Sequence, residues 1–538
     1  MPLTIGGKRG NARALVHILL LAAAFIAWPT SGTRAQRPNK AEIADVVVSP
    51  ASEGVPISRN IYGQFSEHLG HGVYGGLWVG PDSSIPNTRG FRNDVVSALR
   101  ALEVPLLRWP GGCFADKYDW RDGIGPRKRR PNRVNTAWGD VPETNAVGTH
   151  EFMDLLDQLG GTSAYIAGNI GSLTPTDMAR WMEYMTAVGG STLAKERGKN
   201  GSRVPFRVAF FGVGNESWGC GGNMTAEKAA ATTRRYAAFF ATAPGTRTIR
   251  VAAGPNVDDY HFTEVMMRDA GARYFDALSL HHYTFAGTWE RKGSAIGFSE
   301  AEWGSALRNA RRMEELVTRH SAIMDRYDQE QRVMLAVDEW GSWLDTPPGK
   351  DPNLYSWQNT LRDALVAAIT LNVFHRHSDR VRMATIAQMV NVDQAMIHTD
   401  GPRMFRTPTY WVFDLYKPFR GATPLASVTG GPRYRVGAIT LPAVDASVAR
   451  AEDGIIWISL VNLDPTRARN VRLTIPGMSS PCALVGHILT AEAMDQHNDF
   501  DEPDRLVPAR FSATLTTGGI VSLPAKSIVV GRLSLSGS

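Results

Sequence analysis

The sequence predicts an α/β fold in which a (β/α)8 (TIM) barrel is followed by a smaller all-β sandwich domain. Between about Ile61 and Val392, eight short apolar runs alternate with amphipathic helical patterns. No Gly-x-Gly-x-x-Gly follows the first run, which counts against an open dinucleotide-binding sheet. After about Leu415 the helical period disappears, and short alternating runs separated by Gly, Pro, Asn and Asp are typical of a β-sandwich.

The first 35 residues are predicted to be a secretory signal peptide. Three basic residues precede an apolar run from Ala14 to Trp28, and "SGTRAQ" offers a small-residue cleavage site after Ala35. The alternative is a membrane anchor, but the run is shorter than the roughly 20 residues of a spanning helix, and no second such run follows. We therefore expect a secreted or periplasmic protein that has no membrane association after cleavage.

Charge argues against a nucleic-acid partner. Removing the four basic residues of the segment 1–35 lowers the formal charge of the chain from +6 to +2. A near-neutral mature protein is not typical of nucleic-acid binders. The dense basic run Gly125–Arg133 ("GPRKRRPNR") is better explained as a solvated loop than as a phosphate-binding patch.

The segment after the signal peptide divides into three parts. Residues 36–57 are expected to add a strand to the sandwich, because "AEIADVVVSP" has the same texture as the C-terminal part. Residues 58–415 form the predicted barrel and residues 416–538 the C-terminal sandwich. The eight candidate strands of the barrel are "IYGQFSEHL", "VPLLRWP", "SAYIAGN", "FRVAFFGVGNE", "RVAAGP", "FDALSLHHY", "VMLAVDEW" and "RVRMATIAQMVNV".

Helices are expected between these strands. Two of them show apolar residues at positions i, i+3, i+4 and i+7, namely Val95, Ala98, Leu99 and Leu102 in one and Phe152, Leu155, Leu156 and Leu159 in the other. Alternating strands and helices imply parallel strands joined by right-handed crossovers.

Polar residues gather where the predicted strands end, which is where a barrel of this kind carries its active site. The first strand ends in Glu67, the second in Cys113, the fourth in Asn215 and Glu216, the sixth in His281 and Tyr283, the seventh in Glu339, and the last in Gln388.

Two glutamates, Glu216 and Glu339, close the fourth and seventh strands and would face each other across the barrel mouth. Taken alone, an acid at a strand end is more often a solvated loop residue or a helix N-cap. Their joint placement favours a catalytic role. In a pair of carboxyls, one can protonate a leaving oxygen while the other attacks an acetal carbon or activates water. The pattern therefore indicates glycoside hydrolysis.

A series of motifs carries a family resemblance. In order along the chain they are "NIYGQFSEHLG", "LLRWPGGCFADKYDWRDGIGPR", "GTHEFMDL", "GVGNESWGCGGNM", "SLHHY", "DEW" and "AQMVNV". This series resembles glycoside hydrolase family 51, the α-L-arabinofuranosidases of clan A, in the branch with cysteine in "GGCFAD" and "WGCGG". The resemblance covers about Asn60 to Val392, whereas the C-terminal part is similar only in its general pattern of short apolar runs.

The resemblance implies a retaining mechanism that needs no cofactor or metal. Glu216 matches the general acid/base of the family and Glu339 its nucleophile. Such a mechanism forms a covalent glycosyl-enzyme and places the two carboxyls about 5 to 5.5 Å apart.

The resemblance also implies roles in substrate binding. Glu67, Asn215, Tyr283 and Gln388 match positions that hold the furanose hydroxyls or the nucleophile, and His281 matches a position near the acid/base. Trp138 in "NTAWGD" is expected to stack on the sugar, since apolar ring faces suit the C–H face of a furanose.

Cys113 and Cys220 are expected to lie near the barrel mouth, and three states are open for them. They could be free thiols packed beside the sugar, a disulfide formed on export, or two ligands of a metal ion with His71 or His68 as a third. We favour free thiols, because zinc needs three or four converging ligands and the spacing does not specify them. On this interpretation Cys113 lines the substrate site.

Together these inferences predict an exported, retaining exo-α-L-arabinofuranosidase acting on arabinose-containing polysaccharides or oligosaccharides. The family resemblance also implies a homo-oligomer. One alternative is a neighbouring specificity on the same scaffold, such as a xylosidase, an endoglucanase or another furanosidase. The other is a non-catalytic carbohydrate-binding protein, although such a protein would have no need of two apposed acids.

Overall fold

The fold is described from a computed structural model, which covers residues 43–240, 247–477, 482–515 and 519–534. The predicted signal peptide and residues 36–42 lie outside this range. Among the described residues, no helix combines the length and the apolar character that crossing a membrane requires.

Within the described residues, eight parallel strands close into a barrel in the order β10-β11-β12-β13-β2-β5-β8-β9. Their bounds are Gly63–Phe65 (β2), Leu106–Trp109 (β5), Ser163–Gly168 (β8), Val208–Val213 (β9), Ile249–Ala252 (β10), Ala277–Thr284 (β11), Met334–Ser342 (β12) and Val381–Ile386 (β13). Each strand overlaps one of the eight predicted runs, so the barrel prediction is confirmed.

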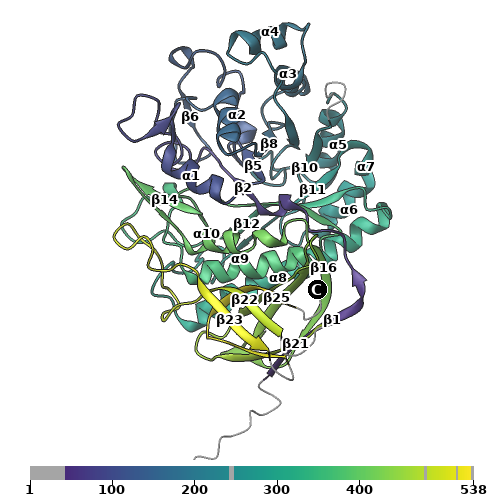
Figure 1. Cartoon of the computed structure of the whole chain (residues 1–538). Helices are drawn as coiled ribbons and strands as arrows, with labels where there is room; N and C mark the ends of the chain where they lie inside the picture. The colour runs from purple at the N-terminus through teal and green to yellow at the C-terminus, as the bar shows by residue number, and fades with distance from the viewer. Residues whose placement is uncertain (1–42, 241–246, 478–481, 516–518, 535–538) are drawn as a thin grey trace, which may run out of the picture. The chain divides into compact units, whose positions relative to one another are not determined.

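Helices lie between the barrel strands along the chain and after the last of them (Figure 1). They are Asn93–Ala101 (α1), Thr149–Gln158 (α2), Pro175–Thr186 (α3), Thr192–Lys199 (α4), Ala226–Ala237 (α5), Tyr260–Asp269 (α6), Gly271–Tyr274 (α7), Glu300–Tyr327 (α8), Leu361–Arg376 (α9) and Pro408–Leu415 (α10). Short 3-10 helices span Arg59–Tyr62, Ala115–Lys117, Arg127–Arg129, Pro352–Leu354 and Lys417–Phe419.

Two apolar layers hold the barrel together. The larger core lies between the strands and the helices and contains the predicted helix faces around Leu99 and Leu156. A smaller cluster fills the inside of the barrel with side chains from several strands, including Leu106, Tyr165 and Phe210. Because the strands are buried on both faces, they read as continuous apolar runs rather than as an alternating pattern.

The C-terminal part forms a nine-stranded sheet in the order β23-β22-β25-β20-β19-β16-β1-β21-β24 within the described residues. Its strands are Ile43–Glu53 (β1), Thr423–Gly430 (β16), Val444–Arg450 (β19), Ile456–Asn462 (β20), Arg469–Thr474 (β21), Cys482–Leu489 (β22), Ala509–Leu515 (β23), Ile520–Leu523 (β24) and Ser527–Ser534 (β25). Inward-facing residues from both halves of the sheet form one core, so the sheet is folded over on itself.

The N-terminal strand β1 belongs to this C-terminal sheet. It pairs antiparallel with β16 and parallel with β21, although several hundred residues separate it from both. In Figure 1 the purple strand β1 lies beside the green strand β16. The pairing agrees with the expected strand, whereas the boundaries at 57/58 and 415/416 stay predictions.

Within the part of the chain that the structure describes, four short hairpins lie outside the barrel and the nine-stranded sheet. They pair Asn87–Thr88 with Phe91–Arg92 (β3, β4), Arg133–Asn135 with Val141–Glu143 (β6, β7), Ile397–Asp400 with Arg403–Arg406 (β14, β15), and Arg433–Val436 with Ile439–Pro442 (β17, β18).

Helices α8 and α9 connect the barrel to the C-terminal sheet. Asp445 on β19 is buried and accepts hydrogen bonds from Arg311 of α8 at 2.6 Å and from Arg376 of α9 at 3.1 Å. His375 of α9 is hydrogen-bonded to Ser447 of the same strand at 2.9 Å. A buried carboxylate is tolerated here because two guanidinium groups compensate its charge.

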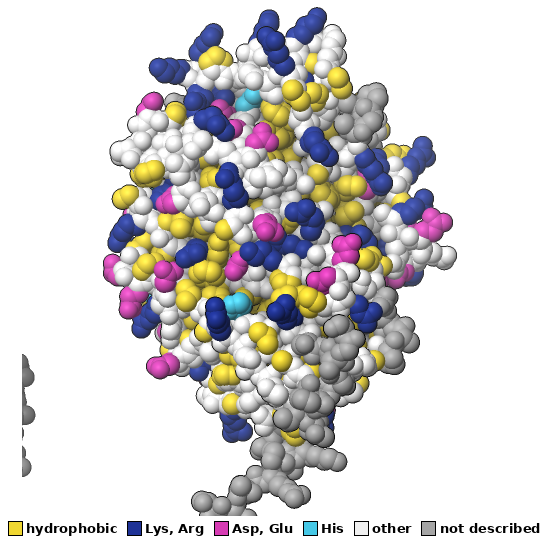
Figure 2. Space-filling model, viewed as in Figure 1, with side chains coloured by type: hydrophobic (Ala, Val, Ile, Leu, Met, Phe, Trp, Pro, Cys, Tyr) yellow, Lys and Arg dark blue, Asp and Glu magenta, His cyan; other side chains and the backbone are white. Residues whose placement is uncertain are grey.

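Basic and acidic side chains are interspersed on the face of the molecule in Figure 2. Part of the basic run Gly125–Arg133 is paired rather than free. Arg130 is hydrogen-bonded to Glu151 at 2.9 Å, and Arg133 contacts Asp122 at 2.7 Å. These ion pairs fit a structured loop better than a phosphate-binding patch.

Candidate active site

A cavity of about 350 Å³ opens at the carboxyl ends of the barrel strands. Eight of the nine predicted site residues line it, namely Glu67, Cys113, Trp138, Glu216, His281, Tyr283, Glu339 and Gln388. The ninth, Asn215, is buried and contacts the site through Arg108. The volume suits a small polar ligand such as a sugar unit.

Glu216 and Glu339 converge on this cavity. Glu216 follows β9 and Glu339 lies on β12, the fourth and seventh barrel strands along the chain. An oxygen of each carboxyl and a ring nitrogen of His281 all lie within 4.8 Å of one another. A single acetal carbon can therefore be reached by both carboxyls, without the wider gap that an inverting pair leaves for water.

Both carboxyl oxygens of Glu339 have hydrogen-bond donors. Arg108 Nη1 donates to Oε1 at 2.9 Å, and the Tyr283 hydroxyl donates to Oε2 at 2.9 Å. Burial raises the pKa of Glu339 to about 7, while the positive charges of His281 and Arg108 oppose this rise. The two donors orient the group and suit its ionised form.

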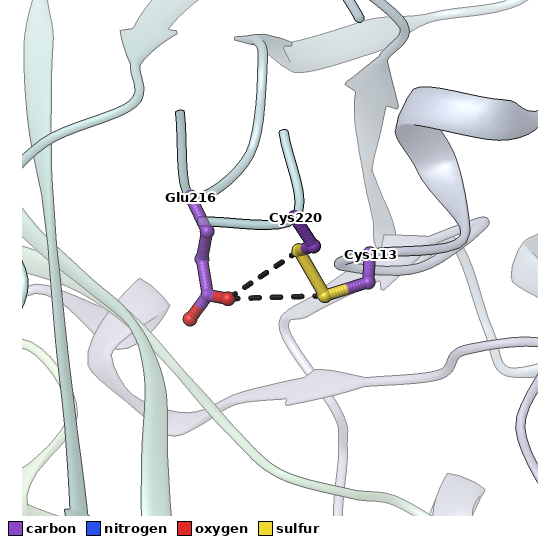
Figure 3. Close-up of side chains that lie close together, drawn as sticks. All are labelled: Cys113, Glu216 and Cys220. Atoms are coloured by element: carbon purple, nitrogen blue, oxygen red, sulfur yellow. Dashed lines mark hydrogen bonds between the residues drawn. A yellow bond between two sulfur atoms is a disulfide. The ribbon is translucent and has the colours of Figure 1, made fainter. Parts of the chain in front are cut away.

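Glu216 sits in a strained turn beside a disulfide. Its backbone φ of 37° is in the left-handed region, which a non-glycine residue adopts at a cost. Its Oε1 is 2.9 Å from His281 Nδ1, and its Oε2 lies 3.5 Å from Cys220 Sγ and 3.8 Å from Cys113 Sγ (Figure 3). Because disulfide sulfurs carry no hydrogen, the contacts to sulfur can be hydrogen bonds only when Glu216 is the donor.

Cys113 and Cys220 are bonded to each other, so the preference for free thiols was wrong. Neither sulfur is then available as a thiolate for a metal ion. The proposed third ligand His68 is also occupied, since Nδ1 is 2.9 Å from Glu143 and Nε2 accepts from Trp109. The disulfide ties the loop after β5 to the loop after β9, two strands that are separated in the barrel by β8.

His281 is the positive centre between the carboxylates. Burial alone would lower the pKa of His281, but the surrounding carboxylates, Glu339 foremost, raise it to about 10. Its Nδ1 also lies 3.5 Å from Glu339 Oε2, and its Nε2 lies 3.3 Å from Asp338 Oδ1. A protonated imidazole has no lone pair for a metal, so the group Glu216, His281 and Glu339 does not favour one.

Asp338 and Glu339 both face the inside of the barrel although they are adjacent on β12. Asp338 accepts hydrogen bonds from Tyr165 at 2.6 Å and from Ser279, while Glu339 contacts Arg108. Neighbouring strand residues normally point to opposite faces. The pairing of β11 with β12 shifts register between Ser279 and His281, and such a bulge can turn two successive side chains inward.

The charge of Asp338 supports His281. Burial would raise the pKa of Asp338, but Arg108 and His281 hold that pKa well below its usual range. The resulting network alternates in sign from Arg108 through Asp338 to His281 and then to Glu339.

Glu67 and Gln388 form a second polar group in the wall. Glu67 Oε1 accepts from the backbone N–H groups of Gly112 at 2.9 Å and Phe114 at 3.0 Å, and Oε2 accepts from Gln388 Nε2 at 3.2 Å. Gln388 Oε1 in turn accepts from the Glu67 N–H at 3.1 Å. Burial raises the pKa of Glu67 against these hydrogen bonds.

A glycine lets the loop after β5 approach this close. A Cβ at Gly112 would lie 2.7 Å from Glu339 Oε1 and 3.4 Å from Asn215 Nδ2. The first distance is below any normal contact, so a larger residue would displace the carboxyl of Glu339. The "GG" of "RWPGGC" is therefore required by close packing at the site.

Aromatic rings form the rest of the wall. Trp138 packs edge to face on Tyr355 with 5.0 Å between ring centroids, and Trp343 packs in the same way on Tyr283 at 5.0 Å. Trp289 contacts Trp343 and remains 58% exposed at the mouth. Rings of this kind present apolar faces to a sugar while their edges keep each other in place.

Three residues of the site were missed by the sequence analysis. They are Arg108, Asp116 and Asp393. Arg108 could have been found as a charged residue within the apolar run "VPLLRWP". Asp116 accepts from the backbone N–H groups of Ile170, Gly171 and Asn215 and thereby fixes the residue before Glu216.

Known α-L-arabinofuranosidases are similar to this chain over most of its length. The family model "Alpha-L-arabinofuranosidase 1 domain" matches residues 98–284, and "Alpha-L-arabinofuranosidase C-terminal domain" matches residues 338–527. The chain is 44% identical over 518 residues to a protein of Bacteroides ovatus named "Intracellular exo-alpha-L-arabinofuranosidase", an alignment that covers 96% of this chain and 99% of the other.

Two solved structures are also similar. The GH51 arabinofuranosidase from Xanthomonas axonopodis pv. citri superposes with a TM-score of 0.89 at 50% identity, covering 91% of this chain and 100% of that one. The alpha-L-arabinofuranosidase from Thermotoga maritima, solved as an arabinose complex, superposes with a TM-score of 0.80 at 29% identity and with the same coverage.

Proposed function

The chain belongs to glycoside hydrolase family 51, the alpha-L-arabinofuranosidases, and we propose that it removes terminal α-L-arabinofuranosyl groups from plant polysaccharides or oligosaccharides with retention of configuration. The observation that supports this most directly is the approach of the Glu216 and Glu339 oxygens to within 4.8 Å at the mouth of the barrel. A retaining pair needs this short separation, because the nucleophile itself and not a water molecule attacks the sugar.

In the first step Glu339 is the nucleophile. One of its carboxylate oxygens forms a bond to the anomeric carbon while the glycosidic C–O bond breaks. Glu216 gives its proton to the departing oxygen, which leaves as an alcohol. The product on the enzyme is a glycosyl ester of Glu339.

In the second step Glu216, now a carboxylate, removes a proton from water. The water oxygen attacks the anomeric carbon, the ester bond breaks, and Glu339 leaves as a carboxylate. Arabinose is released with its original anomeric configuration, and both residues return to their starting states.

His281 keeps the charge balanced through both steps. The negative charge belongs to Glu339 before the ester forms and to Glu216 afterwards. His281 Nδ1 lies 3.5 Å from the first and 2.9 Å from the second, so one imidazolium faces the charge in either state. We assign it as a preorganised electrostatic group rather than as a proton donor.

The other side chains at the cavity are assigned to binding the sugar. Glu67, Asn215, Tyr283 and Gln388 are assigned to the furanose hydroxyls and to the positioning of Glu339. Trp138 is assigned to stacking, and Cys113 contributes through the disulfide beside Glu216.

Hydrolysis of an aryl α-L-arabinofuranoside tests the proposal. We expect turnover by the parent enzyme, with the α anomer of arabinose formed first, as followed by NMR. Glu216→Ala and Glu339→Ala should each lower kcat by roughly 10²- to 10⁴-fold or more. The exposed carboxyl of Glu315 on α8 offers a control, and Glu315→Ala should behave as the parent.

Azide separates the two roles. It should rescue Glu216→Ala by attacking the glycosyl-enzyme, giving an arabinofuranosyl azide of retained configuration. In Glu339→Ala it should replace the nucleophile and give the inverted azide. Formation of the β anomer first by the parent, or exchanged products between the two variants, would contradict the assignment.

Export after cleavage behind Ala35 is also part of the proposal. The Cys113–Cys220 disulfide supports it, because disulfides persist in oxidising compartments. The Bacteroides ovatus relative carries the word "Intracellular" in its name, so the two proteins would differ in this respect. Intact-mass measurement of the protein recovered from the periplasm or medium should give a chain that begins at Gln36.

Assembly into a homo-oligomer stays a prediction from the family resemblance. Light scattering coupled to size-exclusion chromatography of the mature protein measures it directly.

A further inference from the structure

Asp393 stands in the wall of the cavity with a fixed backbone and an unused side chain. Its N–H donates to the Tyr355 carbonyl at 2.9 Å, and its own carbonyl accepts from Asn359 Nδ2 at 3.0 Å. The residue is 4% exposed, and its φ of 50° is in the left-handed region that Asp tolerates better than most residues. The backbone is thus held in a form that presents this side chain at the cavity.

The carboxyl group of Asp393 has no hydrogen-bond partner among the described residues. Its Oδ1 is buried without one. The other three carboxyls of the cavity are all partnered, Glu67 by two backbone N–H groups, Glu216 by His281 and Glu339 by Arg108. A buried polar group left unpaired is rare and calls for a ligand or another explanation.

The surroundings of this carboxyl favour its neutral form. Burial is the largest influence and raises the pKa of Asp393 well above its usual range, and the negative charges of Glu67 and Glu339 raise it further. All three influences act in the same direction, and no cation opposes them. A neutral carboxylic acid offers both an O–H donor and a carbonyl acceptor.

We propose that Asp393 is a specificity residue that forms a hydrogen bond with a hydroxyl group of the glycosyl unit bound in the cavity. A sugar hydroxyl is itself a donor and an acceptor, so it can form a hydrogen bond with the carboxylic acid, which an apolar ligand cannot do. The inference rests on the proposed function, since it requires a sugar beside Glu67 and Glu339.

Deoxy sugars identify the hydroxyl group. The experiment measures kcat/KM for an aryl α-L-arabinofuranoside and for its 2-, 3- and 5-deoxy analogues, with the parent enzyme, Asp393→Asn and Asp393→Leu. Leucine removes the polar group at similar size, whereas asparagine keeps a donor and an acceptor and tolerates the left-handed backbone.

On the complete sugar we expect Asp393→Leu to lose about tenfold or more in kcat/KM, because the sugar hydroxyl is left unpaired. On one deoxy analogue, which lacks that hydroxyl, the parent and Asp393→Leu should become equal to within about twofold. On the other two analogues the loss should persist. Asp393→Asn should stay within a few fold of the parent on every substrate.

Two results would overturn the assignment. One is an Asp393→Leu enzyme that equals the parent on the complete sugar. The other is the same loss on the sugar and on all three analogues, which would indicate a structural role. A parent enzyme without turnover of any aryl arabinofuranoside would instead refute the proposed function, and the Asp393 assignment with it.

Discussion

Arg108 and Glu339 form a buried ion pair with 2.9 Å between Nη1 and Oε1, and the same guanidinium donates through Nη2 to Asn215 at 2.5 Å. One cation, 1% exposed, therefore connects the seventh barrel strand to the residue that precedes Glu216. The relative position of the two catalytic candidates depends on this contact.

Replacing Arg108 by Met should damage both stability and activity. Removing one partner of a buried ion pair leaves an uncompensated charge, which typically costs about 3 to 5 kcal/mol of unfolding free energy. We expect kcat/KM to fall by roughly 100-fold or more, because Glu339 loses its main anchor. Urea unfolding and aryl arabinofuranoside hydrolysis measure the two effects.

Two further variants sharpen this test. Arg108→Lys keeps the charge but cannot reach Asn215 and Glu339 together, so it should be intermediate in kcat/KM. Arg121, half-exposed and paired with Glu196 on the surface, provides the matched control. An Arg108→Met enzyme as stable and active as Arg121→Met would show that the buried pair does not organise the site.

The charge of His281 predicts a pH-dependent contribution to stability. Its pKa is raised from an unfolded value near 6.5 to about 10 in the folded protein. The stabilisation is therefore fully present below pH 6.5 and is lost as pH rises toward 10. The difference in unfolding free energy between the parent and His281→Gln should shrink by up to about 1.4 kcal/mol per pH unit in this window.

Denaturant unfolding at several pH values from 7.5 to 9 measures this difference. His320 is a useful comparison, because burial lowers the pKa of His320 to about 4 and it is neutral throughout this range. The difference between the parent and His320→Gln should therefore not change with pH. A pH-independent difference for His281→Gln as well would mean that His281 is not charged in the folded protein.

Breaking the disulfide should destabilise the protein and slow the reaction. The bond closes a loop with a sequence separation of 107, for which the chain-entropy model gives about 4 to 5 kcal/mol. Because it also packs against Glu216, we expect Cys113→Ser/Cys220→Ser to lose roughly 10- to 100-fold in kcat. Treatment of the parent with a dithiol should give the same change.

A variant of the remaining cysteine distinguishes loss of the disulfide from loss of a thiol elsewhere in the protein. Cys482 is free and buried in the C-terminal sheet. With the dithiol, Cys482→Ala should lose activity as the parent does, and without the dithiol it should keep the parental kcat. If Cys113→Ser/Cys220→Ser also kept the parental kcat, the disulfide would have no part in positioning Glu216.

Gly112→Ala should disturb catalysis through a single methyl group. The new Cβ would lie 2.7 Å from Glu339 Oε1, so the carboxyl must move, and a shift of this size can cost about 10²-fold in kcat/KM. Gly189→Ala is the control, because nothing lies within 4 Å of its Cβ. Equal activity of the two variants would contradict the close approach of the loop.

The barrel strands could be predicted because each is a buried run whose character is local in the sequence. The polar ends of these runs then placed Glu216 and Glu339 at one mouth, since parallel strands of a closed barrel end on the same side. Glu67, His281, Tyr283 and Gln388 followed from the same rule. Arg108 was visible as a charge inside an apolar run, yet its partners lie more than 100 residues away.

Other features depended on contacts that no local pattern records. Asp338 and Glu339 both face inward because β11 and β12 shift register, which the sequence of β12 alone does not show. The wrong preference for free thiols has the same origin, because the spacing of Cys113 and Cys220 says nothing of whether two loops meet. The missing partner of Asp393 likewise depends on everything that surrounds it.

By itself, the sequence determined the order of strands and helices, the sheet-rich C-terminal part and the two acids at the barrel mouth. These follow from hydrophobic period and strand ends, which are properties of neighbouring residues. Only the tertiary structure decided the charge network around His281, the disulfide beside Glu216 and the unpaired carboxyl of Asp393. Each of these depends on distances between residues far apart in the chain, and electrostatic and hydrogen-bond energies are set by those distances.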